Sequence, residues 1–294
     1  MASPYTDLDR PPLSPRGLER ALVTPGGFWT RIDVRAETGS TNADVAAAAL
    51  RGEPEGLVVV AEEQIAGRGR RDRQWTSPPR AGLTLSVLLR PGVPNEAKGW
   101  RPVPAGSYSW LPLLAGVALL EAVRRVAEVE AALKWPNDLL AGPADQSEKG
   151  AGRPGKCAGI LAEVAGDAVV VGIGLNVTNR AEELPETTGL PATSLRLAGA
   201  STTDRDPLLR ALLRGMAGWY AGWREADGDA ELSGLLAAYR RDCATIGRPV
   251  RVLLPGGGEV TGEATSVDVD GQLVIRRADG ADLRVSAGDV VHVR

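Results

Sequence analysis

KCAGILAEVAGDAVVVGIGLNV, residues 156–177, contains two apolar runs separated by an Ala-Gly-Asp turn at residues 165–167. Apolar runs of this length, bounded by turn residues, are typical of buried β-strands. We therefore predict two paired strands, over residues 157–164 and 168–177, at the centre of a sheet.

Small residues interrupt both predicted strands. Inside a sheet such residues forfeit packing, and they often mark a place where a ligand lies against the backbone. Gly172 and Gly174 alternate along their strand, so they share one face. A bulge or close helix packing would explain these two glycines equally well. Together the small residues can form an apolar slot with the Lys156 ammonium at its mouth; they are Ala158, Gly159, Gly172 and Gly174.

The surrounding sequence predicts an α+β domain over residues 28–244, a mixed sheet with flanking helices. Strands are recognised by alternating apolar residues and helices by an apolar stripe of helical period. Helices are predicted over residues 42–51, 111–128, 206–225 and 230–243. Further strands are predicted over residues 57–63, 83–90 and 131–135. The polar segments 92–106 and 142–155 are predicted to be a loop and the tip of a hairpin.

The two ends of the chain differ from this domain. Residues 1–27 hold five prolines and few large apolar residues, which predicts a flexible arm. Residues 245–294 alternate short apolar runs with glycine-containing turns, which predicts a small β-barrel of the SH3 type. Its five strands are expected at residues 250–254, 259–266, 272–277, 282–285 and 290–293.

Composition excludes several classes of function. The chain has 294 residues, a net charge of −3 and a pI near 5.5, whereas nucleic-acid binders more often have a high pI. It has no membrane-spanning apolar run and no signal sequence, so we expect a cytoplasmic protein that binds neither DNA nor membranes. Two cysteines and one histidine give no disulfide framework, no zinc site and no histidine-based catalysis. The histidine, His292, is expected only to end a strand.

A second informative stretch is GRGRRDRQW, residues 67–75, which we call the arginine loop. Its four arginines fall within six positions and repel one another. That density is tolerable when an anion, typically a phosphate, lies among them. Gly67 and Gly69 allow the backbone to approach such an anion closely. A solvated basic loop is the alternative interpretation of the arginines alone.

Two further segments place polar residues at the ends of predicted elements. The STN segment, residues 40–42, precedes a helix, where Thr41 can cap the helix or the segment can bind a small polar ligand group. KWPND, residues 134–138, ends a short strand, and its proline leaves Asn137 and Asp138 on a turn.

Lysine is scarce in this chain. Only four of its 34 basic residues are lysines, so the sequence otherwise uses arginine. An ammonium is a compact charge that a guanidinium cannot imitate. Lys134 and Lys156 lie in strand-like segments and are therefore candidates for a functional cation.

Taken together, these segments resemble the bacterial biotin protein ligases. That family has, in order, a Ser-Thr-Asn segment, Gln-x-x-Gly-Arg-Gly-Arg-x-x-x-x-Trp, Lys-Trp-Pro-Asn-Asp, Lys-x-Ala-Gly-Ile-Leu-x-Glu and Gly-x-Gly-x-Asn. The matching segments here are Ser40–Asn42, Gln64–Trp75, Lys134–Asp138, Lys156–Glu163 and Gly172–Asn176. The resemblance covers residues 30–294 and implies a class II synthetase-like catalytic domain. The helix-turn-helix of members that repress transcription is not expected, so a repressor role is not implied.

The resemblance implies an ATP-dependent biotin–[biotin carboxyl-carrier protein] ligase. Such an enzyme joins biotin to ATP as biotinyl-5′-adenylate and passes the biotinyl group to a lysine of the biotin carboxyl carrier domain of an acyl-CoA carboxylase. Its main physical demand is to bring a carboxylate and the α-phosphate together against their repulsion. Lys156, Arg68 and Arg70 are the implied catalytic cations. Mg²⁺ is expected to arrive with ATP, held largely by phosphates, and the enzyme to be a monomer or a homodimer.

The implied binding site for biotin and the adenylate is spread over the same segments. Ser40, Thr41 and Gln64 match positions that hydrogen-bond biotin, and Trp75 is expected to pack over the ligand. No metal ligand is assigned, although Asn137 and Asp138 could contact magnesium. The implied binding residues are Ser40, Thr41, Asn42, Gln64, Gly67, Arg68, Gly69, Arg70, Trp75, Lys134, Asn137, Asp138, Lys156, Gly159, Gly172, Gly174 and Asn176.

Three features depart from the family pattern. Cys157 replaces a bulkier apolar residue and should preserve packing as a small hydrophobe. The excursion 142–155 is longer than in compact members. The segment between residues 177 and 195 has no aromatic residue, so Leu184 or Leu190 would have to cover adenine.

Two other functions remain as alternatives. A lipoate or octanoate ligase or transferase shares the fold, but those relatives normally lack the arginine loop. A non-enzymatic RNA- or DNA-binding module would place the arginines on phosphates and use the barrel as the reader. The low pI argues against that module.

Residues 64–80 are expected to be mobile until a ligand binds, because glycines and mutually repelling arginines disfavour one compact conformation. Limited proteolysis should therefore cleave this segment more slowly after biotinyl-adenylate is added. Equal cleavage rates with and without the adenylate would contradict the prediction.

Overall fold

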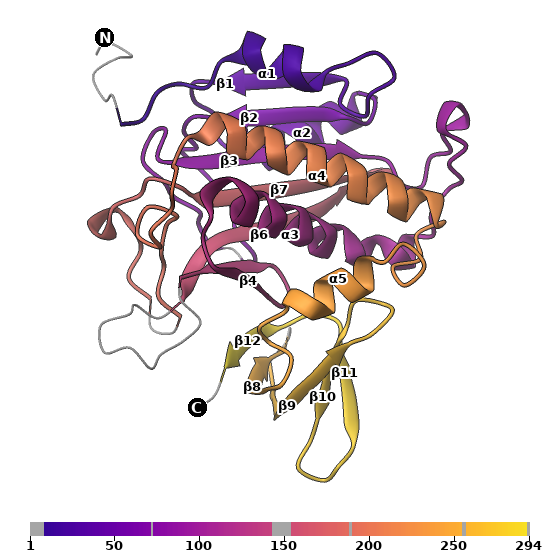
Figure 1. Ribbon diagram of the computed structural model, residues 1–294. Coiled ribbons are helices and arrows are strands. Elements are labelled where there is room, and N and C mark those ends of the chain that lie inside the picture. Colours follow the sequence, from indigo (N-terminus) through magenta and orange to yellow (C-terminus); the bar gives the residue numbers. More distant parts are fainter. Residues whose placement is uncertain (1–8, 72, 143–153, 188–189, 255–256, 293–294) are drawn as a thin grey trace.

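The chain folds into a large mixed sheet with helices on both faces and a small antiparallel sheet at its C-terminal end, as the computed structural model shows (Figure 1). The structure describes residues 9–71, 73–142, 154–187, 190–254 and 257–292. The strand order of the large sheet is β1-β2-β3-β7-β6-β5-β4. β1 and β2 are parallel, and all other neighbours are antiparallel. The predicted α+β class is confirmed.

The strands of the large sheet are β1 Arg31–Arg35, β2 Leu57–Ala61, β3 Gly82–Leu89, β4 Ala131–Lys134, β5 Asp138–Ala141, β6 Gly155–Ala165 and β7 Ala168–Asn176. β6 and β7 form the predicted central hairpin, which turns at Gly166 with a φ of +65° that favours glycine. β1 and β5 were not predicted, because each is short and polar at one end. The antiparallel pairing of β5 with β6 confirms the hairpin that leads into residues 142–155, and its tip at 143–153 lies outside the described residues.

Helices cover both faces of the large sheet. One face carries α3 Trp110–Ala122 and α4 Arg205–Glu225, and α2 Thr41–Leu50 covers the other. α1 Pro15–Leu22 lies against α4 and β1, and α5 Leu235–Asp242 follows a short turn region rather than beginning at residue 230. α3 continues into a π-helical turn, Val123–Ala127; short 3₁₀ turns span Glu96–Lys98, Ala105–Ser109 and Ala181–Glu183.

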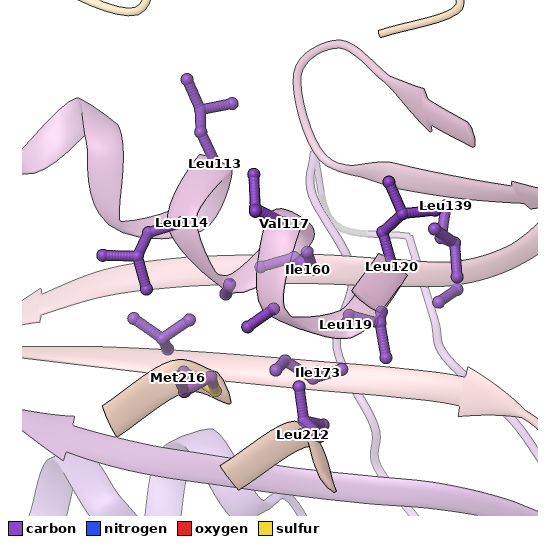
Figure 2. Packing of buried hydrophobic residues seen from close by; sticks show 14 of the residues in the cluster. Leu113, Leu114, Val117, Leu119, Leu120, Leu139, Ile160, Ile173, Leu212 and Met216 are labelled. Atoms are coloured by element: carbon purple, nitrogen blue, oxygen red, sulfur yellow. The ribbon is translucent and has the colours of Figure 1, made fainter. Parts of the chain in front are cut away.

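The main core lies between the sheet and the helices α3 and α4. Figure 2 shows Val117 of α3 close to Ile160 of β6 and Leu120 close to Leu139 of β5. Leu212 of α4 lies near Ile173 of β7 in the same view. α3 is buried nearly all round, because it lies between the sheet, α4 and α5. This face of the sheet is therefore fully occupied by apolar side chains, and any ligand must bind elsewhere.

The register of β3, β7 and β6 puts the glycines on the opposite face, which we call the site face. Gly174 lies between Thr84 of β3 and Gly159 of β6. Gly172 lies between Ser86 and Leu161 in the same way. Since side chains alternate along a strand, these residues share the face that α2 covers.

Ala158 does not belong to the predicted slot. It pairs with Leu175 and is fully buried in the core under α3. The prediction that four small residues line one slot is therefore wrong for Ala158, because alternation along β6 turns it to the other face. Cys157 is also fully buried, and its Sγ lies 3.3 Å from the Asn176 carbonyl, so the expected preservation of packing is confirmed.

The small sheet contains five antiparallel strands in the order β11-β10-β9-β8-β12, which agrees with the predicted SH3-like barrel. Their bounds are β8 Arg248–Leu253, β9 Glu259–Val267, β10 Leu273–Arg276, β11 Asp282–Val285 and β12 Asp289–His292. The turn between β9 and β10 attaches the sheet to the main domain. Trp110 Nε1 donates to the Val269 carbonyl at 2.7 Å, and Trp135 Nε1 donates to the Gly271 carbonyl at 3.0 Å.

The described part of the N-terminal segment is ordered, so the prediction of a flexible arm is wrong for it. Ser14 caps α1 by accepting from the Gly17 amide, and Pro15 occupies the first helical position. Leu18 and Leu22 of α1 are buried in the main core. The prolines that suggested disorder instead delimit a short helix. Among the described residues, no helix combines the length and apolar character needed to cross a bilayer.

Leu18→Ala should lower the free energy of unfolding by about 2–5 kcal/mol, because the side chain is fully buried and its removal leaves a cavity. Leu232→Ala is the matched control, since Leu232 is 79% exposed, and it should change stability by less than about 0.5 kcal/mol. Urea denaturation measures both variants. Equal stability of the two variants would mean that α1 is not part of the cooperative unit.

Candidate active site

One large cavity, of about 1760 Å³, lies on the site face. Its walls come from the start of α2, the arginine loop, the strands β4 to β7 and the small-sheet strands β8 and β12. The volume exceeds that of an ordinary single-ligand pocket. All predicted site residues line this cavity except Gly67. Gly67 instead allows the loop to fold on itself, because a Cβ there would lie 2.2 Å from the Trp75 carbonyl oxygen.

The N-terminus of α2 is held by Ser86 of β3 and by Gln64, which precedes the arginine loop. Thr41 is the first helical residue rather than the cap, and the Ser40 side chain makes no capping bond. Gln64 Oε1 takes that role, accepting from the Thr41 amide at 2.7 Å and from Thr41 Oγ1 at 3.0 Å. Ser86 Oγ lies 2.7 Å from Thr41 Oγ1 on the other side. Residues 40–42, at the N-terminus of α2, are therefore held in place at the cavity.

Asn42 occupies the space above Gly172. A Cβ on Gly172 would lie 2.0 Å from Asn42 Oδ1, so only glycine leaves room for this amide. The Asn42 Nδ2 donates to Glu163 Oε2 at 2.6 Å, and its Oδ1 accepts from Ser86 Oγ at 2.6 Å. Gly172 therefore accommodates the Asn42 side chain and also lines the cavity.

Trp75 occupies the space above Gly174. A Cβ on Gly174 would lie 2.4 Å from Trp75 Cε2, and a Cβ on Gly159 would lie 3.5 Å from Trp75 Cζ3. The indole therefore lies on the two glycines and forms part of the cavity wall. An apolar ligand ring above this wall would pack against the indole rather than against the bare backbone.

Two lysines and one aspartate meet in the cavity wall, with the Lys156 ammonium next to Gly159. Lys156 Nζ lies 2.6 Å from Asp138 Oδ1, and Lys134 Nζ lies 3.7 Å from Asp138 Oδ2. Burial lowers the pKa of the Lys134 ammonium, while the Asp138 carboxylate opposes that shift. The Lys156 side chain is 33% exposed, so it can reach a ligand by leaving Asp138.

The arginine loop reaches both sheets. Arg68 Nη2 donates to Glu163 Oε2 at 3.1 Å, and Arg70 Nη1 donates to Asn137 Oδ1 at 3.0 Å. Arg71 and Arg73 pair instead with Asp289 of β12. Arg70 thus bonds to a neutral amide, whereas Arg68, Arg71 and Arg73 bond to carboxylates. Burial lowers the pKa of the Arg70 guanidinium, which nevertheless stays charged at neutral pH.

Several residues around the cavity were not predicted. Glu163 and Ser86 tie the first turn of α2 to the sheet, and Asp289 binds the arginine loop. Glu163 ends a quoted motif, so its position could have suggested a role; Asp289 carries no such signal. His292 lines the cavity and does end β12 as predicted. Burial and the charges of Lys134 and Arg248 lower the pKa of His292 to about 4, so the ring is neutral at pH 7.

The arrangement suits a reaction between two anions. Arg68, Arg70 and Lys156 line one cavity, and groups that hydrogen-bond or stack border it on the α2 side. Fixed cations in a partly desolvated site offset repulsion between negatively charged reactants. Leu190 lines the same cavity, whereas Leu184 does not.

Comparisons with known proteins agree on one family. Residues 38–177 match the Biotin/lipoate A/B protein ligase family, and residues 245–293 match the Biotin protein ligase C terminal domain. The biotin–[acetyl-CoA-carboxylase] ligase of Mycobacterium tuberculosis is 43% identical over 295 residues, covering 98% of this chain and all of the relative.

Solved structures agree with the sequence relatives. The biotin protein ligase from Aquifex aeolicus in complex with biotin and ATP has a TM-score of 0.68 and 25% identity, covering 90% of this chain and 100% of that chain. The biotin protein ligase from Leishmania major in complex with biotinyl-5-AMP has a TM-score of 0.54 and 26% identity, covering 88% and 99%.

Gly174→Ala should destabilise the protein by about 1–3 kcal/mol, because the new methyl group would displace the Trp75 indole. The same substitution in a Trp75→Ala background should cost much less, which a double-mutant cycle of urea denaturation measures. Gly218→Ala is the matched control, since a Cβ at that helical position meets open space. Equal costs in both backgrounds would contradict the contact.

Proposed function

The chain belongs to the biotin protein ligases, and from that premise we propose that it activates biotin with ATP and transfers the biotinyl group to a carrier lysine. The observation that carries the proposal is the meeting of Arg68, Arg70 and Lys156 at one cavity of two-ligand size. The 43% identity over nearly the whole chain supports the choice of biotin over lipoate.

In the first step a biotin carboxylate oxygen attacks the α-phosphorus of ATP. The bond to the α-phosphorus forms as the bond to pyrophosphate breaks, giving biotinyl-5′-adenylate and pyrophosphate. Arg70 and Lys156 lower the barrier by offsetting the repulsion between the two anions. Arg70 bonds to the neutral amide of Asn137, whereas Lys156 must leave Asp138 and Arg68 must leave Glu163.

In the second step the amine of a carrier lysine attacks the acyl carbon of the adenylate. An amide forms, AMP leaves, and the amine loses a proton. We propose that the acceptor is a biotin carboxyl carrier domain of an acyl-CoA carboxylase, because the Mycobacterium tuberculosis relative is a biotin–[acetyl-CoA-carboxylase] ligase. Leu190 is the proposed cover for adenine, and a cytoplasmic location remains part of the proposal.

We propose that Mg²⁺ enters with ATP and stays on its phosphates. Within the described ranges no group of three His, Cys, Asp or Glu side chains could hold a metal ion. Asp138 already pairs with Lys156 and lies near Lys134, so its carboxylate does not fit a resident metal. No protein ligand for magnesium is therefore assigned.

Incubation of the chain with biotin and Mg-ATP should give biotinyl-5′-adenylate, detected by mass spectrometry, and biotin-dependent ATP–pyrophosphate exchange. Exchange with lipoate alone would overturn the choice of substrate. Retention on nucleic acid at low salt with no adenylate formed would favour the nucleic-acid module instead.

Lys156→Ala should reduce the rate of adenylate formation by about 10²–10³, the effect of losing one charge-stabilising contact. Lys98→Ala is the matched control, because Lys98 lies on the surface and donates to the Gly26 carbonyl away from the cavity. Exchange assays at saturating biotin and ATP measure both variants. A Lys156→Ala rate equal to that of the control would remove Lys156 from the mechanism.

A further inference from the structure

The arginine loop divides its charges between the two sheets. Arg68 and Arg70 contact Glu163 and Asn137 of the main domain. Arg71 and Arg73 pair with Asp289 of the small sheet. A single loop therefore joins the two sheets beside the cavity that both of them line.

The contact with the small sheet has three parts, which we call the Asp289 latch. Arg73 Nη2 lies 2.5 Å and Arg71 Nη1 lies 3.2 Å from Asp289 Oδ2. Arg71 Nη2 also donates to the Leu253 carbonyl at 2.7 Å. The Asp289 side chain is only 19% exposed, so its charge is partly shielded from solvent and salt.

The backbone at Arg71 supports the idea that this contact is maintained. Its φ is +54°, in the left-handed region that non-glycine residues seldom adopt. Such a conformation persists only where surrounding contacts hold it. Backbone hydrogen bonds from Gly69 N to the Arg73 carbonyl at 2.6 Å and from Arg73 N to the Arg70 carbonyl at 3.3 Å close the turn around Arg71. The contacts of Arg71 and Arg73 with β8 and β12 fasten this turn to the small sheet.

We propose that Asp289 is a positioning residue of the small domain, which holds the arginine loop over the cavity and so retains the adenylate until the carrier lysine arrives. This inference rests on the proposed function. A mixed anhydride is lost to water if the site opens early, so a contact that keeps the loop in place protects the intermediate. Asp289 acts through Arg71 and Arg73, the two arginines that it pairs with.

The test compares Asp289→Asn with Asp282→Asn. Asp282 is an exposed carboxylate of the same small sheet that pairs with Arg276 and not with the loop. Each enzyme is loaded with biotin and Mg-ATP in the presence of pyrophosphatase and freed of small molecules. Mass spectrometry then follows loss of the adenylate over time. Asp289→Asn should lose it about 3- to 10-fold faster than wild type, the loss expected for two partly exposed ion pairs.

A charge exchange separates positioning from simple damage to the fold. Asp289→Lys should lose the adenylate faster than Asp289→Asn, because the lysine repels the loop. Combining Asp289→Lys with Arg73→Asp should slow the loss again, since one ion pair is restored in reversed order. If the double variant lost the adenylate as fast as Asp289→Lys alone, the proposed role of Asp289 would be wrong.

A ligand-free measurement keeps the inference distinguishable from the proposed function. Trypsin should cleave the arginine loop faster in Asp289→Asn than in wild type or Asp282→Asn, without any substrate. If wild type formed no adenylate but this difference appeared, the proposed function would fail and the loop contact would stand. If adenylate formed and both the cleavage and the adenylate loss of Asp289→Asn matched wild type, the latch would be wrong.

Discussion

The alternation of side chains along the hairpin of β6 and β7 is the constraint on which the other features depend. On one face it aligns branched apolar residues such as Ile160 and Ile173, which pack against α3 and α4. On the other face it aligns glycines, which leave space at the centre of the sheet. A shift of one residue in this pairing would bury the site and expose the core.

Charge distribution determines how the cavity is built on that face. The cations of the site are held by protein groups: Lys156 by Asp138, Arg68 by Glu163, Arg71 and Arg73 by Asp289. This explains how four arginines within six positions fold into one loop. It also distinguishes the cations, because a group paired with a carboxylate must give up that partner before it can bind a ligand. Among the described residues, Arg70 bonds to the neutral amide of Asn137 and forms no ion pair.

Much of this organisation could be predicted from the sequence, and the failures have physical causes. The apolar run of β7 and the turn at Gly166 indicate the hairpin directly, because those signals are local. The residues of the site could be named from their motifs, but their partners could not. Nothing near Asp289 in the sequence signals that it binds Arg73, since that contact depends on how two sheets pack. The ordered α1 was missed because its stability comes from packing against α4 rather than from its own composition.

The indole resting on Gly174 has a consequence for how such chains can diverge. A side chain fits at position 174 only if the residue at position 75 is smaller than tryptophan. Conversely, a smaller residue at position 75 leaves a cavity unless the residue at position 174 is larger than glycine. Two sites far apart along the gene are thus inherited as a pair, each limiting the other. Surveyed across descendants of this fold, they should covary in volume, small with large, more strongly than either varies with its neighbours in the chain.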